Sequence, residues 1–270
     1  MLRLRGLRCS LSGRRTGPGR PPCYSRRAKV YSLRALYPCM PGTRSLVGTR
    51  GDLVVRVVVL GSTLVAISAT HTLLDADPEI EAHLIMEKAE VGLIGEAPGL
   101  FRNWPPCPAH WVGDLGSQTP QESSSAVRRS WFEKSLGSEL SRRGCTIHLK
   151  TRATSVERGE VNFVGAGPLG SNAIPYEKLL DFRGEAGGTT EWKGAVCRTQ
   201  DAPPGEILGN RADGTTEVWF AEGVAEGNKW LQEMTWYGQD PRTSLSNDIK
   251  FGASEAKTIV DTIIQTTSGQ

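Results

Sequence analysis

The residues best suited to chemistry form a glycine-led turn between an apolar run and a helical pattern. Residues 61–66 read Gly-Ser-Thr-Leu-Val-Ala, which fits the frame G-x-G-x-x-G/A directly after the apolar run 56–60. A tight turn there directs the N-terminus of the following helix, with its free N–H groups and the positive end of its dipole, at a pyrophosphate. Glu87 comes 21 residues after the frame, where a carboxylate can accept hydrogen bonds from a ribose diol. The pattern predicts a dinucleotide site.

The frame departs from its usual composition at its centre. Thr63 takes the position of the glycine that lets the backbone approach a phosphate, and Ala66 takes the last glycine position, which alanine is allowed to fill. The same residues would also form an ordinary strand–helix–strand unit that binds no nucleotide, so both interpretations stand at this point. On the nucleotide interpretation the contacts come from Gly61, Ser62, Thr63, Ala66, Glu87 and Lys88.

Three hydrophobic patterns must hold this turn in place. The continuous β-branched run 56–60 is typical of a central parallel strand that is buried on both faces. A helical stretch follows as far as about Ala76, and Asp77-Pro78 stops it. A second strand is expected over 82–86 and ends at Glu87, so the order strand, helix, strand carries the turn and the acid to one edge of a sheet.

The composition is that of a soluble globular chain with an unusual amino-terminal tail. Of the 270 residues 38% are hydrophobic and 23% are charged, and no apolar run approaches the ~18 residues that cross a bilayer, so no membrane span is expected. Residues 1–51 carry charge +12 and no acid, whereas the remainder carries −9. Such a tail fits an organelle transit peptide, an upstream read-through or a basic arm. It is expected to be disordered and outside the fold, and its lack of interleaved aromatic residues predicts no nucleic-acid partner.

From residue 54 onward the chain resembles the flavoproteins with two dinucleotide-binding domains, the FAD-dependent oxidoreductases of the glutathione-reductase and amine-oxidase type. Leu84–Lys88 resembles the "LLEK" end of their second strand. A helix expected over 126–144 and a strand over 145–149 resemble the unit that adds their third parallel strand. The apolar face of that helix is expected to be formed by Val127, Trp131, Leu136 and Leu140.

Two further segments extend the resemblance. Ile174–Gly184 resembles the strand that closes the first half of the family's cofactor domain, although Asp181 and Arg183 replace small residues. The family ends its cofactor domain with an Asp that holds the ribityl chain, ahead of a helix whose N-terminus faces the flavin. Asp240, or else Asp248, would be that residue. The expected helix has the apolar stripe Ala256, Ile259, Val260, Ile263 and Ile264.

The resemblance implies FAD, bound without a covalent link, with NAD(P) as the alternative cofactor. It adds four contacts to those of the first turn, namely Gly184, Asp240, Asp248 and Ile249.

A second glycine frame has a simpler interpretation. Gly165–Gly170 fits G-x-G-x-x-G better than residues 61–66 do. The proline inside it and Ile174-Pro175 after it stop any helix, so no helix dipole can hold a phosphate there. A glycine-rich hairpin loop is expected instead.

Hydrolase and metal chemistry are both disfavoured. Gly252–Ala256 approximates a nucleophile elbow, but the residues before it are polar, so Ser254 is expected to be a helix N-cap. Cys107 and His110 stand without a second pair at zinc-like spacing, so no metal site is expected.

These observations predict an α/β protein with a Rossmann-type FAD/NAD(P)-binding domain, a parallel sheet, a β-meander and a small inserted β-rich subdomain. The expected divisions are a basic tail (1–53), the first part of the dinucleotide-binding domain (54–184), a β-rich insert on the substrate side (185–237) and a return segment with the last helix (238–270).

The function expected is that of a flavin-dependent oxidoreductase acting on a small molecule, with the redox chemistry carried by FAD. A degenerate dinucleotide-binding protein without activity and an NAD(P)-binding reductase are the alternatives. The sequence identifies no catalytic side chain, substrate or oligomeric state. Its six cysteines form no CxxC and no secretory signal is visible, so a cytoplasmic location is expected, or a mitochondrion or other organelle if the tail is a transit peptide.

Overall fold

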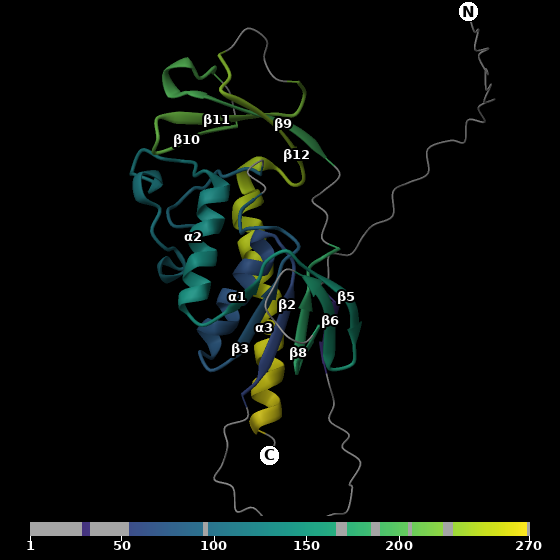
Figure 1. The fold of residues 1–270 in the computed structure, drawn as a ribbon. Helices are drawn as coiled ribbons and strands as arrows, with labels where there is room; N and C mark the ends of the chain where they lie inside the picture. The colour runs from purple at the N-terminus through teal and green to yellow at the C-terminus, as the bar shows by residue number, and fades with distance from the viewer. Residues whose placement is uncertain are drawn as a thin grey trace, which may run out of the picture.

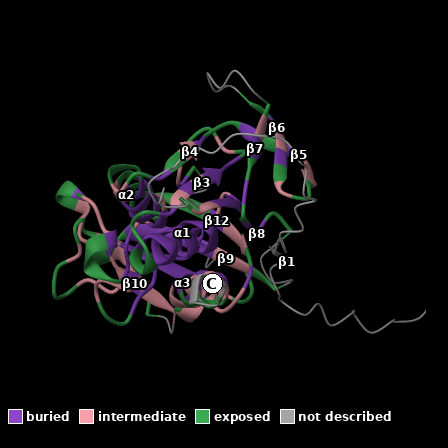
Figure 2. Cartoon of the chain, turned by 90° about the horizontal axis from the view of Figure 1, so that it is seen from below, coloured by how far each residue is buried: buried purple, intermediate pink, exposed green. Residues whose placement is uncertain are grey.

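The computed structural model describes residues 29–32, 54–93, 97–165, 172–184, 190–204, 207–223 and 229–268. A five-stranded sheet has helices on one face and a three-stranded sheet on the other, and a four-stranded sheet lies at one end of the molecule (Figure 1). The central strands and the helix beside them are the most buried part of the chain (Figure 2).

The central sheet is mostly parallel and has the strand order β1-β8-β2-β3-β4. Its strands are β1 (Lys29–Ser32), β2 (Arg56–Leu60), β3 (Glu81–Ile85), β4 (Thr146–His148) and β8 (Lys178–Asp181). β2 pairs in parallel with β3 and β8, and β3 pairs in parallel with β4, whereas β1 runs antiparallel to β8. The parallel strands predicted from the apolar runs are therefore confirmed.

The two faces of β2 are buried against different layers. Val57 and Val59 pack in the hydrophobic core with the helices, whereas Val58 and Leu60 pack against the three-stranded sheet. All four side chains are fully buried. This double burial explains why the strand is a continuous apolar run without polar alternation.

Three long helices cover one face of the central sheet. They are α1 (Leu64–Ala76), α2 (Arg129–Arg142) and α3 (Pro241–Ser268). Every residue of α1 from Leu64 to Leu74 is buried. α3 approaches α1 closely at Gly252, where an added Cβ would lie 2.1 Å from the carbonyl oxygen of Val65. α3 begins beside the four-stranded sheet and ends at the opposite end of the molecule (Figure 1).

The three-stranded sheet is the predicted meander. β5 (Thr151–Glu157), β6 (Glu160–Gly165) and β7 (Ala173–Pro175) pair antiparallel in that order. Val161, Phe163 and Ile174 direct their side chains into the core beneath β2. Residues 166–171, which hold most of the second glycine frame, lie outside the described residues, so the hairpin predicted there stays a prediction.

The four-stranded sheet falls within the predicted β-rich insert. β9 (Glu191–Arg198), β10 (Leu208–Asn210), β11 (Thr215–Phe220) and β12 (Gln232–Tyr237) pair antiparallel in the order β10-β11-β9-β12. One face packs on Leu100 through Val196, Trp219 and Met234. The boundaries of the insert itself stay a prediction.

Two helix predictions were wrong in detail. Trp131, expected on the apolar face of α2, is 45% exposed, because the buried face follows Phe132, Leu136 and Leu140 at intervals of four residues. Ser254, expected to cap the last helix, lies on an exposed face inside α3, which begins 13 residues earlier at Pro241.

The amino-terminal tail contributes one strand. Residues 1–51 were expected to lie wholly outside the fold, yet Lys29–Ser32 form β1 and pair with Lys178–Asp181. An edge strand leaves its backbone N–H and C=O groups unpaired, and β1 supplies partners for those of β8. No helix among the described residues is both long and hydrophobic enough to cross a membrane.

Candidate functional site

The turn predicted to meet a pyrophosphate is tightly built around Gly61. Its N–H donates to the carbonyl oxygen of Ile85 at the end of β3, and the N–H of Phe182 donates to the carbonyl oxygen of Leu60. Gly61 has φ of +152°, and an added Cβ would lie 3.1 Å from the Cβ atoms of both Ala66 and Phe182. A side chain at this position would therefore be strained and would crowd both Ala66 and Phe182.

The start of α1 has hydrogen-bond donors without partners among the described residues. Thr63 occupies the N-cap position, but its side chain makes no capping hydrogen bond, and the first turn of α1 contains no acid. Its buried hydroxyl has no hydrogen-bond partner among the described residues. Helix N-termini carry unpaired N–H groups and a partial positive charge. These residues fit a phosphate group, because both the N–H groups and the spare hydroxyl can donate to its oxygens.

Two of the predicted contacts, from separate parts of the sequence, meet at this turn. The N–H of Glu87, just beyond β3, donates to Oγ of Ser62 at 3.1 Å. The carboxylate of Glu87 is left on the exposed carboxyl edge of the sheet. The next residue, Lys88, is half-buried, and its carbonyl oxygen accepts a hydrogen bond from the N–H of Lys150 at 2.9 Å.

The segment after β8 approaches the turn through Phe182. The side chain of Arg183 is engaged elsewhere: its guanidinium pairs with Asp181 at 2.7 Å and donates to the carbonyl oxygen of Ala153 at 3.2 Å. Gly184 is exposed, and an added Cβ there would meet no atom within 4 Å. A residue with a side chain would therefore fit at this position without contacting the turn.

Asp240 marks the true start of the last helix. Its Oδ1 accepts a hydrogen bond from the N–H of Arg242 at 2.9 Å, and Pro241 occupies the first helical position. An N-cap Asp followed by Pro is a strong helix-start signal. The hydrogen bonds from Arg242 hold the pKa of the Asp240 carboxyl below its usual value, so it is a carboxylate at neutral pH.

Asp248 and Ile249 do not occupy the helix start that the sequence predicted for them. Both lie inside α3, because the helix begins at Pro241. The carboxylate of Asp248 accepts a hydrogen bond from Arg129, and the side chain of Ile249 is buried in the hydrophobic core. A ribityl-binding role for this pair is therefore not supported by its geometry.

A buried cluster of charged side chains lies beside α3 and was not predicted from the sequence. Arg129 is 3% exposed and lies between Glu133, at 2.9 Å, and Asp248. Burial raises the pKa of the Glu133 carboxyl, against the opposing attraction of Arg129. The four-residue spacing of Arg129 and Glu133 on one helix was visible in the sequence. Nothing in the sequence showed that this face is buried against α3.

Three histidines contact neighbouring groups of the fold: His71, His83 and His148. His71 is buried and stacks on Trp111, with the two ring centroids 4.9 Å apart. Its Nε2 lies 3.1 Å from the Leu136 carbonyl oxygen, and burial lowers its pKa to about 3. His83 Nδ1 and His148 Nε2 are 2.9 Å apart, and burial lowers the pKa of His148 to about 4. Both His71 and His148 are therefore neutral at physiological pH.

Cys107 is not activated. Burial raises the pKa of its thiol to about 12, so it stays protonated at neutral pH. Among the described residues, no three His, Cys, Asp or Glu side chains gather in a way that could hold a metal ion.

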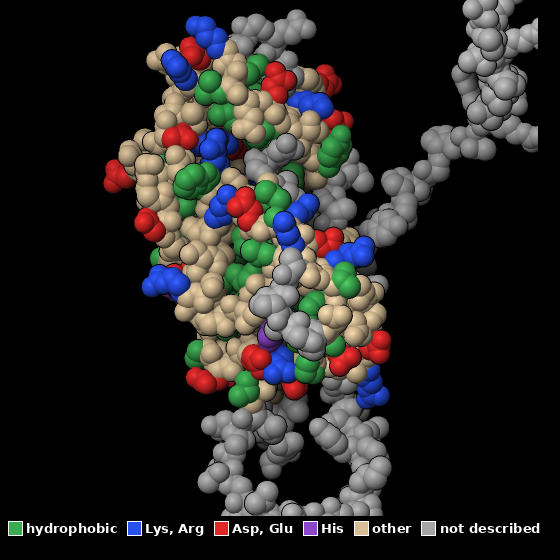
Figure 3. All heavy atoms as spheres, in the orientation of Figure 1, with side chains coloured by type: hydrophobic (Ala, Val, Ile, Leu, Met, Phe, Trp, Pro, Cys, Tyr) green, Lys and Arg blue, Asp and Glu red, His purple; other side chains and the backbone are tan. Residues whose placement is uncertain are grey.

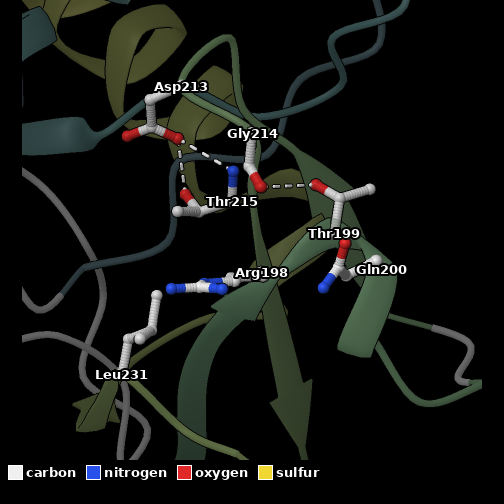
Figure 4. Close-up of a pocket in the computed structure, with 7 residues that line it drawn as sticks. All are labelled: Arg198, Thr199, Gln200, Asp213, Gly214, Thr215 and Leu231. Carbon is white, nitrogen blue, oxygen red and sulfur yellow. Dashed lines mark hydrogen bonds between the residues drawn. The ribbon is translucent and has the colours of Figure 1, made fainter.

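A shallow hollow lies on the four-stranded sheet, away from these residues. It is lined by residues near the ends of β9 and β11, and the Arg198 side chain extends into it (Figure 4). Charged side chains of both signs are interspersed over the face in Figure 3, so no field of one sign dominates that face.

Comparisons with known proteins identify the fold. No family model and no curated protein matches this sequence. The halogenase PltM is similar with a TM-score of 0.53 at 10% identity, over 78% of this chain and 70% of that one. A flavoprotein/dehydrogenase from Cytophaga hutchinsonii is similar with a TM-score of 0.51 at 14% identity, over 78% and 79%.

The chain is shorter than some of the proteins it resembles. It spans 62% of the aromatic hydroxylase CabE from angucycline biosynthesis, at 12% identity and a TM-score of 0.45 over 77% of this chain. The Rossmann-type fold of FAD-binding oxidoreductases, expected from the sequence, is confirmed by the observed sheet order and the similar structures.

Proposed function

We propose that this chain, which has the fold of FAD-dependent oxidoreductases, binds FAD at the carboxyl edge of its parallel sheet and uses the flavin for redox chemistry on a small molecule. The observation that carries the proposal is the turn between β2 and α1. It has a glycine at a position where any side chain would be strained, a helix start without a capping side chain, and a Thr63 hydroxyl that has no hydrogen-bond partner among the described residues.

Each residue of the turn has a distinct role toward the cofactor. The N–H groups at the start of α1 and the Thr63 hydroxyl donate hydrogen bonds to the pyrophosphate oxygens. The hydrogen bond between Ser62 and the Glu87 backbone holds the second strand end against the turn. Glu87 accepts hydrogen bonds from the ribose hydroxyls, because its carboxylate is exposed at that edge.

The start of α3 supplies the second contact. Asp240 is a carboxylate at the N-terminus of a long helix, which is the placement that the resemblance implies for the residue that holds the ribityl chain. FAD, once bound, supplies hydride or electron transfer, while the protein binds and orients it. The four-stranded sheet lies at the end of the molecule where α3 begins, and its packed face carries Trp219, Met234 and Trp236. We place the substrate on that side.

A dinucleotide-binding protein without redox activity is the second candidate. Thr63 stands in the central position of the frame, where a glycine would let the backbone come closer to the phosphate. The ion pair of Arg183 with Asp181 also replaces the small residues that the resemblance leads one to expect after β8.

Reconstitution with FAD tests the proposal. The purified chain is mixed with FAD, separated from free cofactor by gel filtration, and its visible spectrum and flavin fluorescence are recorded. We expect the flavin absorption bands to elute with the protein, and NAD(P)H to compete weakly. A chain that elutes without flavin, under conditions where it melts cooperatively, contradicts the proposal. Bound flavin that no reductant and no oxidant can change supports the second candidate.

A further inference from the structure

Two buried ion-pair clusters converge on a single peptide unit between Pro98 and Gly99. The Pro98 carbonyl oxygen accepts a hydrogen bond from Nη1 of Arg129 at 3.4 Å. The N–H of Gly99, in the same peptide plane, donates to Oε1 of Glu217 at 2.8 Å. Arg129 belongs to α2 and Glu217 to β11, so this peptide is held from the helical layer on one side and from the four-stranded sheet on the other.

Glu217 has every acceptor position engaged. It is fully buried on β11. Besides Gly99, its Oε1 accepts from Nε1 of Trp219 at 3.0 Å, and its Oε2 accepts from Nε and Nη2 of Arg211 at 3.2 and 2.5 Å. A buried carboxylate is stable only when it is paired and fully hydrogen-bonded. The Gly99 N–H therefore belongs to the set that stabilises this charge.

Arg129 is engaged on the opposite side of the peptide. It pairs with Glu133 and Asp248, and its guanidinium carbon lies 5.8 Å from the ring centroid of Trp236 on β12. Its contacts join α2, α3 and the four-stranded sheet as well as the Pro98 carbonyl. With its charge buried and paired, Arg129 holds the peptide in a fixed direction.

The position of the peptide is confined by its neighbours. A Cβ at Gly99 would lie 1.8 Å from the carbonyl oxygen of Val127. The Val127 N–H donates to the Gly99 carbonyl oxygen at 3.0 Å, and the Phe101 N–H donates to the Ser125 carbonyl oxygen at 3.0 Å. The segment 97–101 is thus part of a strand-like arrangement that admits no side chain at its centre.

This segment ends the connection that leaves the dinucleotide edge at Glu87. The near part of that connection packs on α2, where an added Cβ at Gly92 would lie 2.3 Å from the Ser130 carbonyl oxygen. The far part is held by Glu217 and Arg129. The start of α2 therefore contacts both the residues that follow Glu87 and, through Arg129, the Pro98–Gly99 peptide that Glu217 holds.

We propose that Glu217 is a positioning residue: through the Pro98–Gly99 peptide and Arg129 it fixes the start of α2, and with it the described residues after Glu87, in the conformation that FAD binding requires. The inference rests on the proposed function. Glu217 acts without touching the cofactor, since its oxygens are fully engaged and its side chain is buried. The four-stranded sheet thereby influences cofactor affinity as well as the substrate side.

The variant Glu217→Gln tests the inference with two measurements. It keeps the shape of the side chain but removes the charge that the Gly99 N–H and Arg211 stabilise. We expect faster amide hydrogen exchange over residues 97–101, measured by mass spectrometry, and a dissociation constant for FAD raised about tenfold or more. The matched control is Glu191→Gln on β9, an exposed carboxylate paired with Lys193, and it should change neither measurement.

A milder variant covers the case in which Glu217→Gln fails to fold. Arg211→Lys keeps a positive charge beside Glu217 but loses the paired hydrogen bonds, and it should change both measurements in the same direction by smaller factors. Unchanged exchange over 97–101 in a folded variant overturns the inference. Faster exchange with unchanged FAD affinity also overturns it. If the wild-type chain binds no FAD, the proposed function fails and the cofactor role of Glu217 fails with it, while exchange alone reports whether Glu217 holds the peptide.

Discussion

Two segments were expected to contact a dinucleotide: the βαβ unit at residues 56–87 and the return segment at residues 238–250. The structure brings the expected residues together in the first segment but not in the second. In the first, Gly61, Ser62 and Glu87 are brought together at one edge, as the spacing required. In the second, only Asp240 stands at a helix start, whereas Asp248 is paired with a buried arginine.

The two segments differ in which interactions determine where their polar residues lie. The first unit is defined by two buried strands and a turn, which are close in sequence and leave one arrangement of their ends. The place of Asp248 depends on Arg129, which comes from a distant helix. Polar residues that are buried by a tertiary partner look, in the sequence, like residues of an exposed loop.

The largest effect on FAD binding is expected from Gly61→Val. The new side chain would collide with the Cβ atoms of Ala66 and Phe182, already 3.1 Å from a simple Cβ, at a φ of +152° that valine rarely adopts. We expect FAD binding to be lost and stability to fall by about 1–3 kcal/mol, measured by titration and thermal melting. Gly223→Val is the control, since a Cβ there meets nothing within 4 Å. Retained binding in Gly61→Val would move the cofactor away from this turn.

The largest effect on stability is expected from Arg129→Met, which leaves the buried carboxylate of Glu133 and the half-buried carboxylate of Asp248 without their cation. Breaking a buried pair in this way costs about 3–5 kcal/mol of unfolding free energy, measured by denaturant titration. Arg142→Met, on the exposed end of the same helix, should stay within about 0.5 kcal/mol. Equal losses in the two variants would show that the cluster contributes nothing special.

The loss in Arg129→Met should depend on pH. Burial raises the folded-state pKa of Glu133 above its value in the unfolded chain. Between these two values the folded state binds the extra proton, so stability increases as pH falls through this range and decreases as pH rises. Without Arg129 the folded-state pKa rises further, and the variant should recover part of its lost stability at mildly acidic pH. A loss that is the same at acidic and neutral pH would contradict this account.

A smaller effect is expected from Glu87→Gln. The side chain is exposed at the strand end, so the melting temperature should not change, while the loss of a charged acceptor weakens FAD binding by about 1.5–3 kcal/mol. Glu90→Gln, an exposed neighbour paired with Lys134, serves as the control. An identical titration curve for wild type and Glu87→Gln would remove Glu87 from the site.

The smallest effect separates the two helix starts proposed for α3. Asp240→Ala removes the acceptor of the Arg242 N–H and should cost about 1 kcal/mol of stability. Ser254→Ala changes an exposed residue inside the helix, where alanine is the better helix former, and should be neutral or slightly stabilising. A greater loss of stability in Ser254→Ala than in Asp240→Ala would support the helix start at Ser254 that the sequence predicted.

The parts predictable from sequence were those set by local pattern. The continuous apolar run of β2 predicted its strand, and Asp77-Pro78 predicted the end of α1. The start of α3 was missed although Asp240-Pro241 is a local signal, because the polar residues after it interrupt the apolar stripe. The sequence analysis missed the burial of Arg129, Glu133 and Glu217 for another reason. Charged residues are mostly exposed, and a buried charge is stable only when tertiary partners pair with it.

The burial of α1 has a consequence for the order in which the chain becomes structured. The helix is enclosed on all sides, and the close contact between Val65 and Gly252 belongs to α3, which follows nearly all the intervening chain. During synthesis β2 and α1 leave the ribosome early, with their apolar surface uncovered until α3 arrives. Contacts between segments so distant in sequence form slowly. The core around α1 can therefore close only after α3 has been synthesised.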